Sequence, residues 1–215
     1  MIQTVVVIAK RPVPGKVKTR LIGQFTAEQA CDLAAAALQD TLDAAETMPC
    51  ATRVLLLSGR SGGIAGPGWR VVTQARGGLD RRLAAGFAQL DVGPAFLVGM
   101  DTPQLRAEHL SFDPDRYDAC LGPAADGGYW AIGFADPRMA AGTIRGVPMS
   151  TAETGAVQLH RLRQAGLRVQ LLAELTDVDT PVEAERVARA DPDTRFARCW
   201  RGHAESTLRR RDGHR

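Results

Sequence analysis

The chain has few cysteines, and none of them lies near another in the sequence. Among its 215 residues the four cysteines, at positions 31, 50, 120 and 199, form no C-x-x-C pair. This spacing argues against a structural zinc site or a disulfide framework, and it favours reduced thiols in a cytoplasm. The four histidines also lack metal-ligand spacing. We therefore assign no metal to cysteine or histidine.

Long hydrophobic runs and a targeting segment are missing as well. No stretch approaches the roughly 20 apolar residues that a membrane helix needs, and no basic leader precedes the first apolar run. Aromatic residues make up only 5% of the chain and do not interleave with its basic residues, which argues against nucleic acid as a partner. We expect a soluble, cytoplasmic protein without a membrane span.

Two common phosphate-binding motifs are absent. The pair Gly15-Lys16 is followed by Val17 and has no upstream glycine, so it does not form a P-loop. No G-x-G-x-x-G sequence opens a helix. A phosphate site in this chain would need another architecture.

Strand-like and helix-like segments alternate, which favours a mainly parallel sheet covered on both faces. We predict an α/β fold, a three-layer α/β/α sandwich with a Rossmann-like sheet. One domain is expected over residues 1–190, and a basic, partly disordered extension over residues 191–215. The expected strands are Val5–Ala9, Arg53–Ser58, Trp69–Gln74, Ala95–Gly99, Tyr117–Leu121, Gly128–Phe134 and Arg168–Leu172; the expected helices are Ala27–Ala45, Leu79–Leu90, Thr151–Gly166 and Val182–Ala190.

A basic loop follows the first expected strand. Five cationic side chains fall within eleven positions, and they are Lys10, Arg11, Lys16, Lys18 and Arg20. Open α/β sheets bind ligands at the carboxyl ends of their strands, and Lys and Arg at such a place favour the phosphates of a nucleotide. A solvated charge run is the alternative, but the position directly after a buried strand favours a binding site.

Carboxylates stand at the ends of later strands. Asp101 follows the fourth expected strand, Asp126 precedes the sixth, and Asp177 and Asp179 follow the seventh. Each could simply cap a turn or a helix, and Asp126-Gly127-Gly128 could be a tight turn that needs a positive φ. Their combination favours one site. Magnesium is usually held by one or two carboxylates plus substrate phosphates, so we predict Mg²⁺ or Mn²⁺ between these aspartates and a nucleotide.

Four segments resemble, in order, the motifs of a bacterial family of GT-A-fold, glycosyltransferase-like proteins. Ala9–Leu21 matches A-K-x-P-x-P-G-x-V-K-T-R-L, Gly99–Pro103 matches G-x-D-x-P, Gly122–Tyr129 matches G-P-x-x-D-G-G-Y, and Asp177–Pro181 matches D-V-D-T-P. More distantly, the chain is similar to the guanylyltransferases of molybdenum-cofactor and phospholactate biosynthesis. The resemblance implies a nucleotide-diphospho-sugar transferase fold, with the nucleotide over the N-terminal half of the sheet.

The resemblance also implies roles for single residues. Asp101 would ligate the metal, with Asp179 and then Asp177 completing the site. The candidate nucleotide- and phosphate-binding residues are Lys10, Arg11, Gly15, Lys16, Lys18, Arg20 and Gln74. The candidate catalytic residues are Asp126, Lys18 and Arg20, and Gly127, Gly128 and Tyr129 would face the acceptor. The chain departs from the family pattern in the Gln74–Leu83 element, and Met149 replaces a usual tryptophan.

These observations lead to a metal-dependent transferase that acts on a nucleotide or nucleotide-diphospho-sugar and a small-molecule acceptor. Glycosyl transfer and nucleotidyl transfer from a nucleoside triphosphate both need this set of residues. A nucleotide-binding regulator without turnover is the alternative from another class. An apolar edge strand or the last helix could pair two subunits into a homodimer.

Overall fold

A seven-stranded sheet forms the centre of the protein, described by a computed structural model for residues 1–60 and 62–212. Its strands are β1 (Thr4–Lys10), β2 (Thr52–Ser58), β3 (Trp69–Thr73), β4 (Ala95–Gly99), β5 (Ala119–Pro123), β6 (Tyr129–Phe134) and β7 (Val169–Leu171). The strand order is β3-β2-β1-β4-β6-β5-β7. Only β6 runs antiparallel to its neighbours β4 and β5. The expected mainly parallel α/β fold is confirmed.

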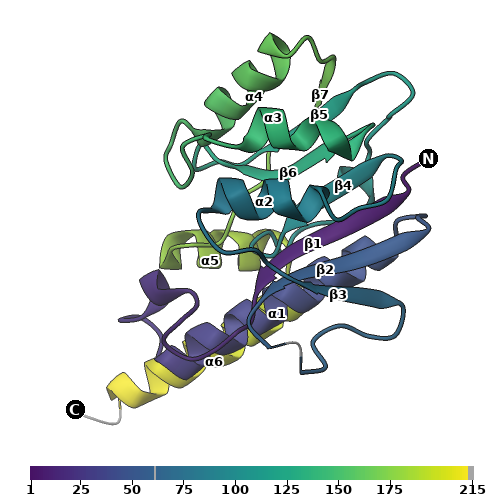
Figure 1. The fold of residues 1–215 in the computed structure, drawn as a ribbon. Coiled ribbons are helices and arrows are strands. Elements are labelled where there is room, and N and C mark those ends of the chain that lie inside the picture. Colours follow the sequence, from purple (N-terminus) through teal and green to yellow (C-terminus); the bar gives the residue numbers. More distant parts are fainter. Residues whose placement is uncertain (61, 213–215) are drawn as a thin grey trace.

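Helices cover both faces of this sheet (Figure 1). On one face lie α2 (Leu79–Phe87), α3 (Ala140–Ile144) and α4 (Thr154–Gln164), and on the other lie α1 (Ala27–Glu46) and α6 (Arg195–Asp212), with α5 (Pro181–Ala190) packed against α6. Short 3-10 turns are η1 (Thr19–Leu21), η2 (Ala107–His109) and η3 (Pro137–Met139). The molecule therefore has three layers.

Alternate residues of β1 explain why its sequence is apolar without interruption. Val5 and Val7 belong to the buried cluster that contains Leu38 of α1, whereas Val6 belongs to the cluster that contains Leu83 of α2. Successive side chains of a strand point to opposite faces. Since helices cover both faces, both sets of side chains must be apolar.

Helix α1 begins at a capping box formed by Thr26 and Gln29. The hydroxyl of Thr26 accepts a hydrogen bond from the backbone N–H of Gln29, and the side chain of Gln29 accepts one from the backbone N–H of Thr26. This capping box satisfies two N–H groups that the helix itself leaves unpaired. It fixes the direction in which the chain leaves the basic loop.

The C-terminal segment is more ordered than its basic composition suggests. Residues Arg195–Asp212 form helix α6, and Phe196 and Ala197 are buried in the cluster that α6 shares with α1 and α5. Arg195 forms an ion pair with Asp43 of α1. The first turns of α6 thus belong to the helical layer, and residues 213–215 of the predicted extension lie outside the described residues.

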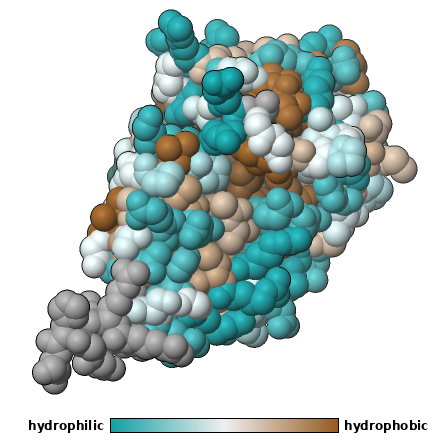
Figure 2. Space-filling view, turned by 90° about the horizontal axis from the view of Figure 1, so that it is seen from below, coloured by the Kyte–Doolittle hydropathy of each residue, from teal (hydrophilic) through white to brown (hydrophobic). Residues whose placement is uncertain are grey.

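Hydrophobic and hydrophilic residues are unevenly distributed on one face of the molecule. Seen from below, hydrophobic residues gather near the middle of the face shown in Figure 2, and hydrophilic residues surround them. Among the described residues, no helix is long and apolar enough to cross a membrane.

The topology brings the predicted site residues together. In parallel strands the carboxyl ends meet at one edge of the sheet. Because β6 is antiparallel to β4, its first residues lie at that same edge. Lys10 at the end of β1, Asp101 after β4 and Asp126 before β6 therefore converge, although more than 100 positions separate Lys10 from Asp126 in the sequence.

Candidate active site

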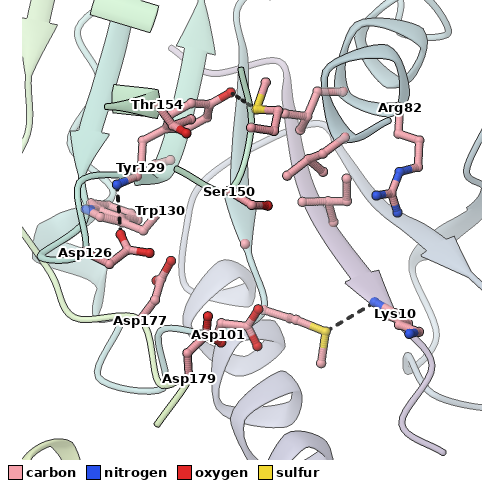
Figure 3. A pocket seen from close by; sticks show the side chains of 18 of the residues that line it. Lys10, Arg82, Asp101, Asp126, Tyr129, Trp130, Ser150, Thr154, Asp177 and Asp179 are labelled. Carbon is pink, nitrogen blue, oxygen red and sulfur yellow. Dashed lines mark hydrogen bonds between the residues drawn. The ribbon is translucent and has the colours of Figure 1, made fainter. Parts of the chain in front are cut away.

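A cavity of about 550 Å³ opens at this edge of the sheet. Its lining comes from the ends of β1 and β4, the start of β6, helix α2 and the segment after β7. Figure 3 shows Asp101, Asp126, Asp177 and Asp179 gathered on one side of it, and Lys10 on the other. The strand-end carboxylates are thus neighbours, as the sequence predicts.

Lys18 lies among these carboxylates rather than in the open cavity. Its Nζ is 2.5 Å from Asp101 Oδ1 and 3.2 Å from Asp179 Oδ1, and it also donates to the carbonyl oxygen of Val178. Only 5% of the side chain is exposed. Burial lowers the pKa of Lys18, but the two carboxylates outweigh it and leave that pKa raised. The ammonium is therefore charged and all three of its donors are used.

The backbone of Lys18 is strained to reach this position. Its φ of 46° and ψ of 40° are left-handed, which is uncommon for a residue with a side chain. The other such residue in the described chain outside glycine is Ser150, with a φ of 60°, and it lines the same cavity. Strained backbone of this kind persists where surrounding contacts hold it and often marks functional sites.

Asp177 has no such partner. Within the described residues its carboxylate accepts no hydrogen bond and forms no ion pair, although Asp101, Asp126 and Asp179 are close enough to affect its ionisation. Burial, followed by the charge of Asp101, raises the pKa of Asp177 to about 7. The charge of Lys18 lowers this pKa but does not offset burial and the neighbouring carboxylates.

This arrangement fits a divalent cation in part. The donors are all carboxylate oxygens, and one of the carboxylates is unpaired, which is the chemistry that Mg²⁺ or Mn²⁺ requires. However, no group of three or more His, Cys, Asp or Glu side chains in residues 1–60 and 62–212 is placed to enclose an ion. Asp101, Asp177 and Asp179 would hold a metal only together with oxygens from a substrate, as is usual for Mg²⁺.

The basic loop divides between the cavity and other surroundings. Lys10 and Arg20 line the cavity; Arg20 pairs with Asp179 at 3.2 Å, and the Nζ of Lys10 donates to the carbonyl oxygen of Lys16 at 2.6 Å. Arg11 lies outside the lining and donates to the carbonyl oxygen of Arg60. Gly15 and Lys16 are exposed and also lie outside it.

The turn before β6 is shaped by its glycines. Asp126 Oδ1 accepts a hydrogen bond from the backbone N–H of Gly128 at 2.8 Å, so the turn holds this carboxylate. Gly127 has a φ of 87°, and a Cβ there would lie 1.9 Å from the carbonyl oxygen of Ala152. Gly127 therefore permits close packing against the segment before α4. Asp126 and Gly128 line the cavity, whereas Gly127 does not.

Tyr129 lines the upper part of the cavity together with Met149, Ser150 and Thr154. From the sequence, no role could be assigned to these three neighbours. The hydroxyl of Tyr129 lies 3.9 Å from the sulfur of Met149, and burial raises its pKa well above the usual range. Ser150 and Thr154 line the cavity beside it (Figure 3). Only the departure of Met149 from the family pattern pointed to this segment.

Gln74 lines the cavity, but its side-chain amide is hydrogen-bonded to other groups of the protein. Its Nε2 donates to the carbonyl oxygens of Ala9 at 2.8 Å and Leu56 at 2.9 Å. Its Oε1 accepts from Arg82 at 3.1 Å. Arg82 also lines the cavity, and sequence reasoning missed it because it is one of two adjacent arginines on an amphipathic helix.

The protein has a mainly parallel α/β sheet with a cavity lined by charged and apolar residues at its carboxyl edge. This fold is that of the GT-A-like and nucleotidyltransferase-like class. Within it, the chain belongs to the family described as "Uncharacterized protein conserved in bacteria (DUF2064)", whose model matches residues 34–151. Among curated proteins, none matches the chain at a significant level.

Solved structures show the same fold. A "putative nucleotide-diphospho-sugar transferase" from Desulfovibrio desulfuricans G20 is 25% identical, with a TM-score of 0.85 and 98% of each chain covered. A nucleotidyl transferase from Methanothermobacter thermautotrophicus is 14% identical, with a TM-score of 0.61, 92% of this chain and 98% of that chain covered. Rv0371c from Mycobacterium tuberculosis H37Rv is 22% identical, with a TM-score of 0.57 and coverage of 87% and 98%.

Proposed function

We propose that this protein is a metal-dependent transferase that uses a nucleotide-diphospho-sugar or another nucleotide as donor. One observation carries the proposal: a single cavity joins two cations of the basic loop, Lys10 and Arg20, to carboxylates from three separate strand ends. A polyanion held together with a divalent cation accounts for both sets of charges. The neighbour from Desulfovibrio desulfuricans, with the same fold over 98% of both chains, supports a donor of this class.

The chain's own residues would act mainly by positioning and by neutralising charge. Lys10 and Arg20 would bind phosphate oxygens, and Lys18 would hold Asp101 and Asp179 in place. A bound Mg²⁺ or Mn²⁺ would neutralise the phosphates and stabilise charge on the leaving group.

The acceptor would approach from the side of Asp126. This carboxylate is exposed, lines the cavity and is fixed by its own turn. It could take a proton from an acceptor hydroxyl group in either reaction. Tyr129 and Thr154 would form the wall that the acceptor contacts.

Nucleotidyl transfer is the second candidate, and the supply of cations at the cavity supports it. The negative charge of a triphosphate exceeds that of a diphospho-sugar, and the basic loop supplies both Lys10 and Arg20 to this space. The two reactions release different products. Glycosyl transfer from a nucleoside diphospho-sugar releases a nucleoside diphosphate, whereas nucleotidyl transfer from a triphosphate releases pyrophosphate.

A thermal-shift panel of nucleoside triphosphates and nucleotide sugars, with Mg²⁺, Mn²⁺ or a chelator, tests the proposal. A ligand at 100 times its Kd should stabilise the protein by about 2.7 kcal/mol, a Tm rise of roughly 5–10 °C for a chain of this size. Asp101→Asn should abolish the metal-dependent part of the shift, and Asp91→Asn, at an exposed position outside the cavity, should preserve it. A protein that no nucleotide stabilises under any metal condition would contradict the proposal.

A regulator that binds without turnover would also show the shift. Ligands that stabilise the protein are therefore incubated with candidate acceptors, and nucleoside diphosphate and pyrophosphate are assayed separately. Release of either product that is lost in Asp101→Asn supports a transferase. Binding without release of either product favours the regulator.

A further inference from the structure

Arg82 is a cation of the cavity whose charge no carboxylate balances. It forms no ion pair among the described residues, and its Nε–H is buried without a hydrogen-bond acceptor. Its one side-chain hydrogen bond goes to the neutral amide of Gln74. A half-buried, unpaired guanidinium is costly in a folded protein, so its persistence at a cavity points to a ligand.

Gln74 fixes how this guanidinium is presented. Both N–H groups of the Gln74 amide are used by carbonyl oxygens at the ends of β1 and β2, which are those of Ala9 and Leu56. The amide cannot turn over without losing both bonds, so Oε1 must face Arg82. Nη1 of Arg82 donates one N–H to Gln74 Oε1, and Nε is covered by the protein, so the second N–H of Nη1 and the two N–H groups of Nη2 remain as donors.

The surroundings of Arg82 are apolar. Leu79 lies three positions earlier on α2, so it shares a helix face with Arg82. Leu79, Leu83 and Ile8 all line the cavity. Phosphate oxygens are strongly hydrated and would bind more favourably to Lys10 and Arg20, which lie at the two ends of the basic loop, than to a cation between apolar side chains. An apolar wall with one guanidinium suits a flat aromatic group whose edge carries hydrogen-bond acceptors.

We propose that Arg82, positioned by Gln74, reads the nucleobase of the donor, and that it selects an edge with two adjacent acceptors. Guanine offers N7 and O6, the pair that arginine binds with two parallel hydrogen bonds. Cytosine offers O2 and N3. Adenine places an amino donor beside N7, and uracil places an N–H donor beside each carbonyl, so both leave one arginine donor unmatched. This selection rests on the proposed function, because it assumes a nucleotide in the cavity.

Titration calorimetry with Mg²⁺ tests it, using GTP, CTP, ATP, UTP and inorganic triphosphate as probes. The wild-type protein should bind GTP or CTP at least tenfold more tightly than ATP and UTP. Arg82→Leu should bind all four nucleotides within threefold of one another, while its affinity for inorganic triphosphate stays within twofold of wild type. Arg81→Leu, at the exposed neighbouring position on α2, is the matched control and should keep the preference.

Two further measurements keep the outcome clear. Arg82→Lys retains the charge without the planar pair of donors, so it should also lose the preference for GTP or CTP. This variant serves as the test if Arg82→Leu does not fold. If GTP is preferred, 7-deaza-GTP, which lacks the N7 acceptor, should bind the wild type about tenfold more weakly than GTP.

Failure of this inference differs from failure of the proposed function. Nucleotides that bind the wild type without preference, or an Arg82→Leu variant that loses affinity for inorganic triphosphate as much as for GTP, would overturn base reading and make Arg82 a phosphate ligand at most. A wild-type protein that binds none of the five probes would overturn the proposed function as well.

Discussion

The two sides of the cavity manage charge in opposite ways. On the side of α2, one guanidinium, that of Arg82, is held by a neutral amide and lacks an anionic partner among the described residues. On the side of β4 and β7, Asp101 and Asp179 share the ammonium of Lys18, and Asp177 has no partner in the part of the chain that the structure describes. Within the described chain, the side of α2 therefore has a cation without a neighbouring anion, and the side of β4 and β7 has a carboxylate without a directly bonded cation.

This difference indicates what kind of ligand completes the site. A neutral apolar molecule would relieve neither side. The proposed nucleotide with a divalent cation would relieve both, because its base would offer acceptors to Arg82 and its metal-bound phosphates would lie against the carboxylates. Lys18 comes from the basic loop, yet its ammonium lies among the carboxylates on the side of β4 and β7.

Two glycines near the site, one in the turn before β6 and one in the basic loop, differ in how tightly they are packed. Gly127 has a φ of 87°, and a Cβ there would meet the backbone oxygen of Ala152 at 1.9 Å; Gly15 has a φ of 73° and open space around it. Gly127→Ala should lower the free energy of unfolding by about 3 kcal/mol, from left-handed strain and from the clash. Gly15→Ala should lower it by only about 1 kcal/mol. Urea unfolding measures both, and equal losses would mean that packing of the turn before β6 is not decisive.

Lys18 is the cation on which the acidic side depends. Lys18→Met removes the counter-charge of Asp101 and Asp179 together with a hydrogen bond to Val178. Breaking a buried ion pair costs about 3–5 kcal/mol. Because the two carboxylates are 40% and 43% exposed, solvent screening reduces the expected loss to about 2 kcal/mol.

Lys16 provides the matched control for this loss, because it is exposed and belongs to the same loop. Lys16→Met should change the free energy of unfolding by less than about 0.5 kcal/mol. If the two methionine variants unfold at the same urea concentration, the ammonium of Lys18 does not hold the acidic side together.

The ionised carboxylate of Asp177 should lower the folding stability of the metal-free protein at and above neutral pH, compared with an uncharged side chain at this position. Its pKa is about 7 in the folded protein, raised from an ordinary value of 3.8 by burial and by Asp101. As pH rises from 4 to 7 the unfolded chain loses this proton first, so folding stability falls across that window. Asp177→Asn does not titrate. In the presence of a chelator it should therefore match the wild type near pH 4 and exceed it by about 1 kcal/mol at pH 8, after allowance for solvent screening.

Chemical unfolding of both proteins at a series of pH values measures this difference. A gain that is the same at pH 4 and pH 8 would show that the charge of Asp177 is not its cause. Mg²⁺ provides an independent check, because it should stabilise the wild type more than Asp177→Asn.

The sheet could be predicted from the sequence because its signal is local. Buried parallel strands read as short apolar runs such as Val5–Ala9, and punctuation by Gly, Pro and Asp marks their ends. The antiparallel direction of β6 could not be read in this way, because a buried strand has the same composition in either direction. Helix α6 was not predicted for a different reason. Most of its residues are basic or polar, and the few apolar residues that it buries, such as Phe196 and Ala197, give only a weak helical pattern.

From the sequence, only those site residues could be predicted that lie at a strand end or in the segment next to it. The convergence of Asp101, Asp126 and Asp177 follows from topology, and the structure places all three at one cavity. The direction of each side chain does not follow. The sequence groups Lys18 with the other loop cations, yet a left-handed backbone turns it into the acidic cluster. Arg82 lies on a helix, so strand-end reasoning could not find it.

A further difference is expected within the basic loop itself. Lys10 lines the cavity, whereas the adjacent Arg11 lies outside the lining and donates to the carbonyl oxygen of Arg60. Loss of a charge-assisted contact costs about 1.5 kcal/mol, so Lys10→Ala should weaken nucleotide binding by about tenfold. Arg11→Ala should change the Kd by less than about twofold, as expected for a residue outside the site. Titration with one nucleotide at fixed salt compares the two variants. Equal losses would mean that the loop acts through its summed charge, and the division between Lys10 and Arg11 would then have no part in binding.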